Sequence, residues 1–102
     1  MTTPEEKALQ EAHPGFILRT EFLEPKGISK VDLVRRTGIP ASRWTEITKG
    51  RRRITAKTAL ALGMIFKMDP WFWLNLQSSY DLRIARLELE ENLQERAQPL
   101  KT

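Results

Sequence analysis

Basic side chains able to bind a polyanion are concentrated in one quarter of this 102-residue sequence. Residues 29–53 hold eight Lys or Arg against two acidic residues, a net charge of +6, whereas the whole chain carries +4. Such a block within a segment that can fold is typical of a protein that binds nucleic acid. It also occurs on the solvated faces of many soluble proteins, so composition alone leaves both interpretations open.

The sequence supplies little for other kinds of chemistry. It has no cysteine, which excludes thiolate zinc sites and cysteine nucleophiles, and its single histidine, His13, does not favour a metal site. Since it also lacks a glycine-rich phosphate loop and paired carboxylates in an apolar setting, we expect neither an enzyme nor a cofactor. Without cysteines, a long apolar run or an apolar N-terminus at Met1–Gln10, we expect a cytoplasmic protein.

Helix signals divide residues 29–50 into two short helices. Ser29 is a good N-cap with an aspartate three residues later, and Gly38 is placed to end the first helix. Pro40 opens the second helix after a very short connection, and Gly50 ends it. Two short helices around a glycine-bearing turn predict a helix-turn-helix.

The remaining helices must support this motif. His13-Pro14-Gly15 predicts the start of one helix, and further helices are predicted from Thr55 and from Asp69-Pro70, the last continuing toward Ala97. No interval predicts a strand. The fold class is therefore all-α, a five-helix bundle with a central helix-turn-helix and an extended C-terminal helix.

This bundle accounts for most of the chain, and a polar segment precedes it. That segment is expected to be a frayed arm or a single helical turn. The expected organisation is an N-terminal arm (1–12), a helix-turn-helix DNA-binding and dimerisation domain (13–97) and a C-terminal tail (98–102).

In a helix-turn-helix, the second helix lies in the major groove and presents its N-terminal residues to base edges. Arg43 is the candidate for reading sequence, because a guanidinium bound to guanine O6 and N7 contributes about 1–3 kcal/mol of discrimination. Other residues are expected to touch bases or phosphates and to add affinity and register. These candidates are Ser29, Ala41, Ser42, Thr45, Lys49, Arg51, Arg52 and Arg53.

The basic and aromatic residues of the chain can also be explained without DNA binding. Arg43 and the arginines at 51–53 could be merely solvated, and Arg35 and Arg36 could simply complement a helix dipole. We interpret Trp44 as a core residue rather than a platform for stacking. The aromatic cluster at 71–73 is interpreted as core or dimer interface.

Five stretches of the sequence resemble antitoxins of the HigA group, within the Xre-like helix-turn-helix superfamily. They are, in order, His13-Pro14-Gly15, Glu21-Phe22-Leu23-Glu24-Pro25, Ile39-Pro40-Ala41-Ser42-Arg43, Ile54-Thr55-Ala56-Lys57-Thr58-Ala59-Leu60 and Phe72-Trp73-Leu74-Asn75-Leu76-Gln77. The resemblance implies a homodimer that binds palindromic operator DNA in its own promoter. It also implies neutralisation of a cognate toxin protein of the RelE-like, mRNA-cleaving kind.

The resemblance assigns roles residue by residue and shows three departures. It places Ser29, Ala41, Ser42, Arg43 and Thr45 at the family's DNA-contacting positions. The departures are Trp44 in place of an aliphatic residue, Trp71 in place of a polar one, and Arg52-Arg53 in a loop that is usually less basic.

A dimer is expected because one helix-turn-helix reads only a few base pairs, and twofold symmetry supplies a second half-site. Leu76, Tyr80, Ile84 and Leu87 follow 4-4-3 spacing and are the predicted dimer interface. The alternative is that this stripe folds back on its own domain.

Acidic residues beside the stripe offer a surface for a basic toxin, although a solvated helix end has the same composition. They are Glu88, Glu90, Glu91 and Glu95, and the N-terminal region is the other acidic candidate.

The function predicted from the sequence is thus that of an antitoxin that represses its own operon. The main alternative is a stand-alone helix-turn-helix transcriptional repressor without a toxin partner, which the presence or absence of an adjacent toxin-sized reading frame would distinguish. A third interpretation keeps the fold and makes it a protein-interaction module.

Overall fold

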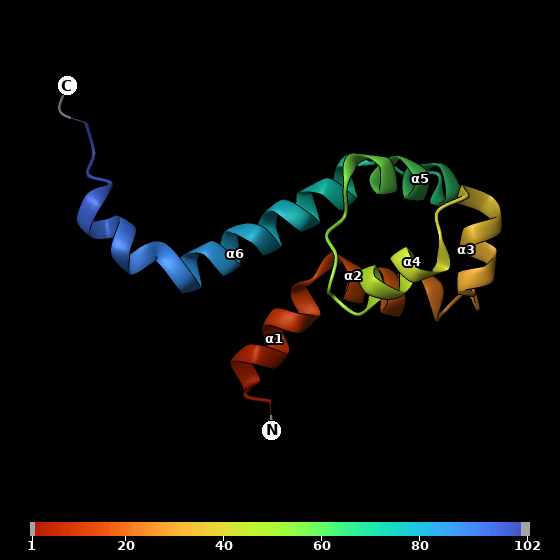
Figure 1. Cartoon of the computed structure of the whole chain (residues 1–102), viewed down its shortest axis with the longest axis horizontal. Coiled ribbons are helices and arrows are strands. Elements are labelled where there is room, and N and C mark those ends of the chain that lie inside the picture. Colours follow the sequence, from red (N-terminus) through yellow and green to blue (C-terminus); the bar gives the residue numbers. More distant parts are fainter. Residues whose placement is uncertain (1, 101–102) are drawn as a thin grey trace.

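The computed structural model describes residues 2–100, with every side chain in that range except that of Glu91. Its regular structure is helical throughout, which confirms the all-α class, but seven helices replace the five expected. They are α1 (Pro4–Ala12), α2 (Pro14–Ile17), the π-helical turn η1 (Leu18–Leu23), α3 (Lys30–Thr37), α4 (Ala41–Thr48), α5 (Ala56–Phe66) and α6 (Trp71–Arg96) (Figure 1).

The first additional helix is α1, which lies where a frayed arm or one helical turn was expected. Its start is well specified, because the Thr3 side chain accepts a hydrogen bond from the amide of Glu6 and Pro4 occupies the first helical position. None of its side chains is buried. Leu9 and Ala12 are half-buried at helical spacing, so these two positions and the N-cap were signals from which the whole helix could have been predicted.

The second additional element is η1, which continues α2 with a wider turn. The amide of Glu24 donates to the carbonyl of Arg19, five residues earlier, at 2.9 Å. In an α-helix, side chains five positions apart point in different directions, and the wider π turn brings them closer to one face. Leu18 and Leu23 consequently both reach the core.

The core lies between α2, η1, α3, α4, α5 and the start of α6. Trp44 and Trp73 are fully buried, which confirms Trp44 as a core residue. Phe22 packs against Trp73 and Phe66, with ring centroids 4.9 and 5.1 Å away. Trp71, in contrast, is 64% exposed, so only part of the aromatic cluster at 71–73 is core.

The helix-turn-helix is formed by α3 and α4, as predicted. Gly38 ends α3 in the left-handed conformation, with φ 72°, and its amide donates to the carbonyl of Val34 at 2.8 Å. A residue with a side chain is strained at this φ, so glycine allows the tight turn into Pro40 and α4. The turn thereby fixes the angle between the two helices.

The molecule consists of a compact head from which α6 projects, while α1 leaves the head beside the first half of α6 (Figure 1). Its 26 residues give α6 a length of about 39 Å. Its outer half exposes several leucines, including Leu87, Leu89 and Leu93. None of the helices in residues 2–100 combines the length and apolar character needed to cross a bilayer.

Candidate nucleic-acid interface

The first turn of α4 is presented to solvent. Trp44 and Ile47 are fully buried and fix the orientation of the helix, whereas Ala41 and Ser42 are exposed. Arg43 and Thr45 are half-buried at the sides of this exposed face. The residues predicted to meet base edges therefore lie together, away from the buried side of α4.

Arg43 is the only cation in this first turn. It forms no ion pair with any of the described residues, in contrast to Arg35 and Arg53. A guanidinium carries five N–H donors in a planar fork. The N–H donors of Arg43 can therefore bind an acceptor on another molecule, such as a base or a phosphate.

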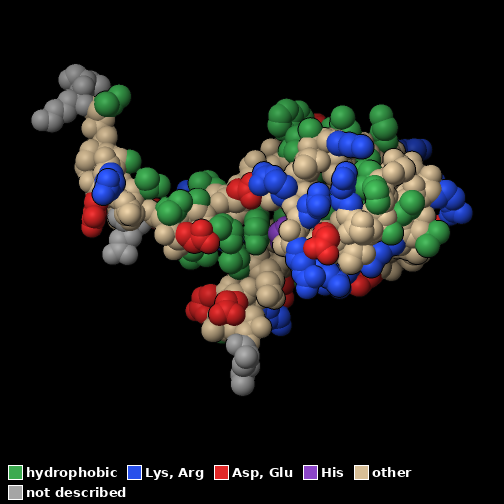
Figure 2. All heavy atoms as spheres, viewed as in Figure 1, with side chains coloured by type: hydrophobic (Ala, Val, Ile, Leu, Met, Phe, Trp, Pro, Cys, Tyr) green, Lys and Arg blue, Asp and Glu red, His purple; other side chains and the backbone are tan. Residues whose placement is uncertain are grey.

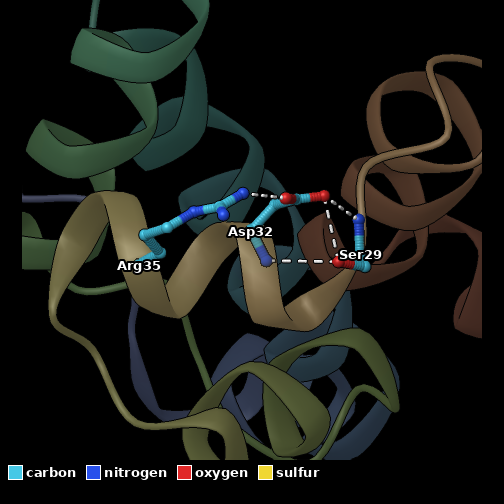
Figure 3. A network of polar contacts seen from close by, with 3 residues as sticks. All are labelled: Ser29, Asp32 and Arg35. Atoms are coloured by element: carbon cyan, nitrogen blue, oxygen red, sulfur yellow. Dashed lines mark hydrogen bonds and ion pairs between the residues drawn. The ribbon is translucent and has the colours of Figure 1, made fainter.

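At the start of α3, Ser29 and Asp32 form a capping box (Figure 3). The Ser29 amide donates to the Asp32 carboxylate at 2.9 Å, and the Asp32 amide donates to the Ser29 hydroxyl at 3.2 Å. Arg35 donates to the same carboxylate at 2.6 Å. These contacts, led by the Ser29 backbone hydrogen bond, lower the pKa of Asp32 and keep it ionised.

The capping box limits what Ser29 can offer to a ligand. Its hydroxyl donates to Asp32 at 2.9 Å, so that proton is already engaged within the chain. The amides of Lys30 and Val31 precede the first intrahelical bond, from Leu33 to the Ser29 carbonyl. Such amides at a helix N-terminus have no partner inside the helix and favour an anion such as phosphate.

The loop between α4 and α5 (residues 49–55), which we call the arginine loop, is bound to α6 by a polar network. The buried amide of Ile54 donates to Oε1 of Gln77 at 2.7 Å, and Nε2 of Gln77 donates to Asp81 at 2.9 Å. Arg53 donates to the second oxygen of the same Asp81 carboxylate at 2.8 Å. This network holds the arginine loop in a fixed position beside α4.

The sequence reasoning missed the roles of Gln77 and Asp81. Gln77 ends one of the stretches that resemble HigA antitoxins, and its hydrogen-bond partner Ile54 is 23 residues away in sequence. Asp81 likewise pairs with Arg53 across 28 residues. No local spacing reports such contacts, although a glutamine at an apolar position of a helix is a signal that could have been noted.

The other cations of the loop are more accessible. Arg51 lies 3.9 Å from Glu46, and the two side chains are 66% and 40% exposed, so this pair is weak. Lys49 and Arg52 are exposed and form no ion pair with the described residues. Three of the four basic residues predicted to bind phosphate are therefore accessible, and Arg53 is engaged with Asp81.

The residues of the predicted dimer interface become more exposed along α6. Leu76 packs against the core, and the Tyr80 ring contacts His13 edge to face with centroids 4.8 Å apart. Ile84 is half-buried, and Leu87 is 69% exposed. The first half of the stripe thus packs within its own chain, as in the alternative interpretation, while the outer half stays accessible.

The acidic residues of α6 come directly after Leu87 in the sequence, in the accessible outer half of the helix. Glu88, Glu90 and Glu95 are exposed, and the side chain of Glu91 lies outside those that the structure describes.

His13 has a structural role at the start of α2. Its Nδ1 accepts a hydrogen bond from the Gly15 amide at 2.8 Å, and the residue is only 4% exposed. Burial lowers the pKa of His13, and the Asp81 charge opposes this effect more weakly. No three His, Asp or Glu side chains among those described are grouped to hold a metal ion.

The fold and the exposed face of α4 define a helix-turn-helix protein. No protein-family model matches the chain. It is 47% identical to virulence-associated protein I of Dichelobacter nodosus over 73 residues, 72% of this chain and 68% of the relative. It is 34% identical to antitoxin HigA-1 of Vibrio cholerae over 77 residues, 76% of this chain and 72% of that protein.

Solved structures give the same relationship. Pseudomonas aeruginosa antitoxin HigA, solved with the higBA promoter, superposes with a TM-score of 0.83 and 37% identity, over 87% of this chain and 97% of that one. The chain belongs to the HigA-type antitoxins of the Xre-like helix-turn-helix superfamily.

Proposed function

We propose that this chain is the antitoxin of a type II toxin–antitoxin system and represses its own operon by binding operator DNA as a dimer. The observation that carries the proposal is the exposed first turn of α4, with the available Arg43 guanidinium beside buried Trp44. The related P. aeruginosa antitoxin HigA, solved with its promoter DNA, supports the same role for this chain.

The residues of this face and of the loop after α4 have separate tasks in this proposal. Arg43 reads a guanine in the major groove, while Ser42 and Thr45 donate to bases or phosphates and Ala41 touches a thymine methyl. Lys49, Arg51 and Arg52 bind the backbone, which adds affinity without sequence preference. The α3 N-terminus at Ser29 supplies amides to a further phosphate.

Dimerisation is proposed to use the outer half of α6. Leu82, Leu87, Leu89 and Leu93 are each at least 50% exposed, and the 7-4 spacing of Leu82, Leu89 and Leu93 places these three on one face of the helix. An exposed apolar stripe on an otherwise charged helix favours burial against a partner, and a second copy of the chain would cover these leucines. In this arrangement residues 13–97 provide both DNA binding and dimerisation.

Toxin neutralisation is the second part of the proposal. The exposed glutamates of α6 would meet a basic, RNA-cleaving toxin of the RelE-like kind by charge complementarity. The test is co-purification of the product of an adjacent toxin-sized reading frame with the tagged chain, together with rescue of growth in cells that express this product. Absence of both would favour the alternative, a stand-alone repressor, which agrees with relatives known only as HTH-type transcriptional regulators.

DNA binding is tested by fluorescence anisotropy with the DNA immediately upstream of the gene and with a scrambled duplex. We expect a preference of about 10³ or more for the upstream DNA and a steep loss of affinity between about 50 and 200 mM salt. Equal, weak affinity for the two duplexes would contradict operator recognition. No binding to either would favour a protein-interaction module.

A further inference from the structure

A groove of about 790 Å³ lies beside the proposed DNA-binding face. One wall is formed by the start of α3 and the loop after α4, and the other by α1 and the α2–η1 segment. The rings of His13 and Tyr80, which contact each other, also line the groove. The groove therefore joins the helix-turn-helix to elements that have no role in the motif itself.

Five cations line this groove, against the single carboxylate of Glu11. They are Lys7, Arg19, Lys30, Lys49 and Arg51. In Figure 2 Lys and Arg side chains gather next to the single histidine, between α1 and the head. Like charges facing one space repel each other, and an anionic ligand between them removes that cost.

The wall on the α4 side already belongs to the proposed DNA site. Lys49 and Arg51 are the backbone-binding residues of the loop, and Lys30 follows Ser29 at the α3 N-terminus. A DNA strand that contacts these residues would lie next to the groove. Lys7 and Arg19 lie on the other wall of the same groove and belong to neither α3 nor α4.

We propose that the phosphodiester backbone flanking each half-site lies in this groove, and that Lys7 and Arg19 bind its phosphates. This extension rests on the proposed function and widens the DNA contact of one protomer beyond the helix-turn-helix. It gives α1 a function, since none of the side chains of that helix is buried.

Both residues are able to make these contacts. Lys7 is exposed on α1, with a flexible side chain that suits a phosphate. Arg19 is held by one ion pair, from Nη1 to Glu24 at 3.1 Å, and lies over the Phe16 ring at 5.2 Å. A guanidinium has five donors, so Arg19 keeps others for a phosphate while Glu24 and Phe16 restrict its orientation.

The test compares two operator duplexes, one trimmed to the footprint of the helix-turn-helix and one extended by about one helical turn on each side. The proteins are wild type, a Lys7→Gln/Arg19→Gln double variant, and Lys26→Gln as a control. Lys26 lies outside the groove, over the Phe66 ring. Circular dichroism at increasing temperature checks that all three fold alike.

Two lost phosphate contacts in each protomer, four in the dimer, should lower the slope of log affinity against log salt by about 3.6 on the extended duplex and weaken binding at least about tenfold. The trimmed duplex and the preference over scrambled DNA should change little. The proposal is overturned if the double variant matches Lys26→Gln on the extended duplex. It is also overturned if the double variant binds DNA normally but no longer binds polyglutamate, which would assign the groove to an acidic protein segment.

A separate variant distinguishes this failure from failure of the proposed function. If wild type prefers the operator and Arg43→Ala lowers that preference, the helix-turn-helix role stands whatever the groove variants show. If wild type has no preference for the operator, both the proposed function and this extension are contradicted.

Discussion

Gly15 determines how closely α2 can approach the end of α4. A Cβ at this position would lie 1.7 Å from the carbonyl oxygen of Ile47, which is backbone and cannot rotate away. The absence of a side chain therefore allows α4 to sit against the first core helix. The sequence predicted a helix start at this glycine, but a contact with a residue 32 positions later has no local signature.

We predict that Gly15→Ala destabilises the protein by more than about 3 kcal/mol, because overpacking against rigid backbone exceeds the usual range. Urea unfolding followed by circular dichroism measures the change. Gly27→Ala is the matched control, since Gly27 has φ 62° and no atom near its Cβ position. It should cost only the strain of about 1–2 kcal/mol. Equal effects of the two substitutions would show that the close contact does not limit packing.

We predict that the stability of the protein depends on pH because His13 is buried. Its folded-state pKa lies below the usual value of 6.5, mainly because of burial, so the unfolded chain binds the proton more readily. The stabilisation is complete above about pH 6.5 and is lost as the pH falls from there through the folded-state pKa. His13→Asn keeps a capping acceptor and removes the titration.

Unfolding free energies from urea titrations between pH 7.5 and 5 test this prediction. Wild type should lose stability over that interval, and His13→Asn should lose less. Parallel curves for the two proteins would assign the pH dependence to other groups.

At the scale of helices, most elements with local signals were predicted, whereas α1 was not expected as a full helix despite its Thr3 N-cap and Pro4. Thr55 caps α5, as its position before an apolar run indicated, and Gly38 ends α3. In contrast, the backbone hydrogen bonds of η1 span five residues instead of the four of an α-helix. The spacing of apolar residues does not distinguish these two kinds of helix. The attachment of the arginine loop through Gln77 depends on tertiary contacts, which sequence spacing does not encode.

That attachment gives a prediction about α6. Gln77→Leu leaves the buried amide of Ile54 without an acceptor and should cost about 1–3 kcal/mol of stability. It should also weaken DNA binding several-fold, because the arginine loop loses its fixed position. Ser78→Ala, on an exposed neighbour in the same helix, should leave both quantities unchanged. Normal stability of Gln77→Leu would exclude the network as a structural constraint.

For the whole molecule, the main question is what covers the outer half of α6. Replacing Leu89 and Leu93 with aspartate should yield a monomer in sedimentation velocity and weaken operator binding, since two linked half-sites are then bound separately. Leu100→Asp changes a residue that is 94% exposed, and should leave the dimer intact. A wild-type monomer, or a dimer that tolerates the double substitution, would contradict the role proposed for α6.

If the first turn of α4 reads DNA sequence, the Arg43→Ala substitution should reduce discrimination between DNA sequences. The quantity to measure is the ratio of affinities for operator and scrambled DNA, with Lys26→Ala as a control for the lost charge. We predict that Arg43→Ala lowers this ratio about 10- to 100-fold, equivalent to about 1–3 kcal/mol, while Lys26→Ala preserves it. An unchanged ratio in Arg43→Ala would contradict the assignment of α4 as the recognition helix.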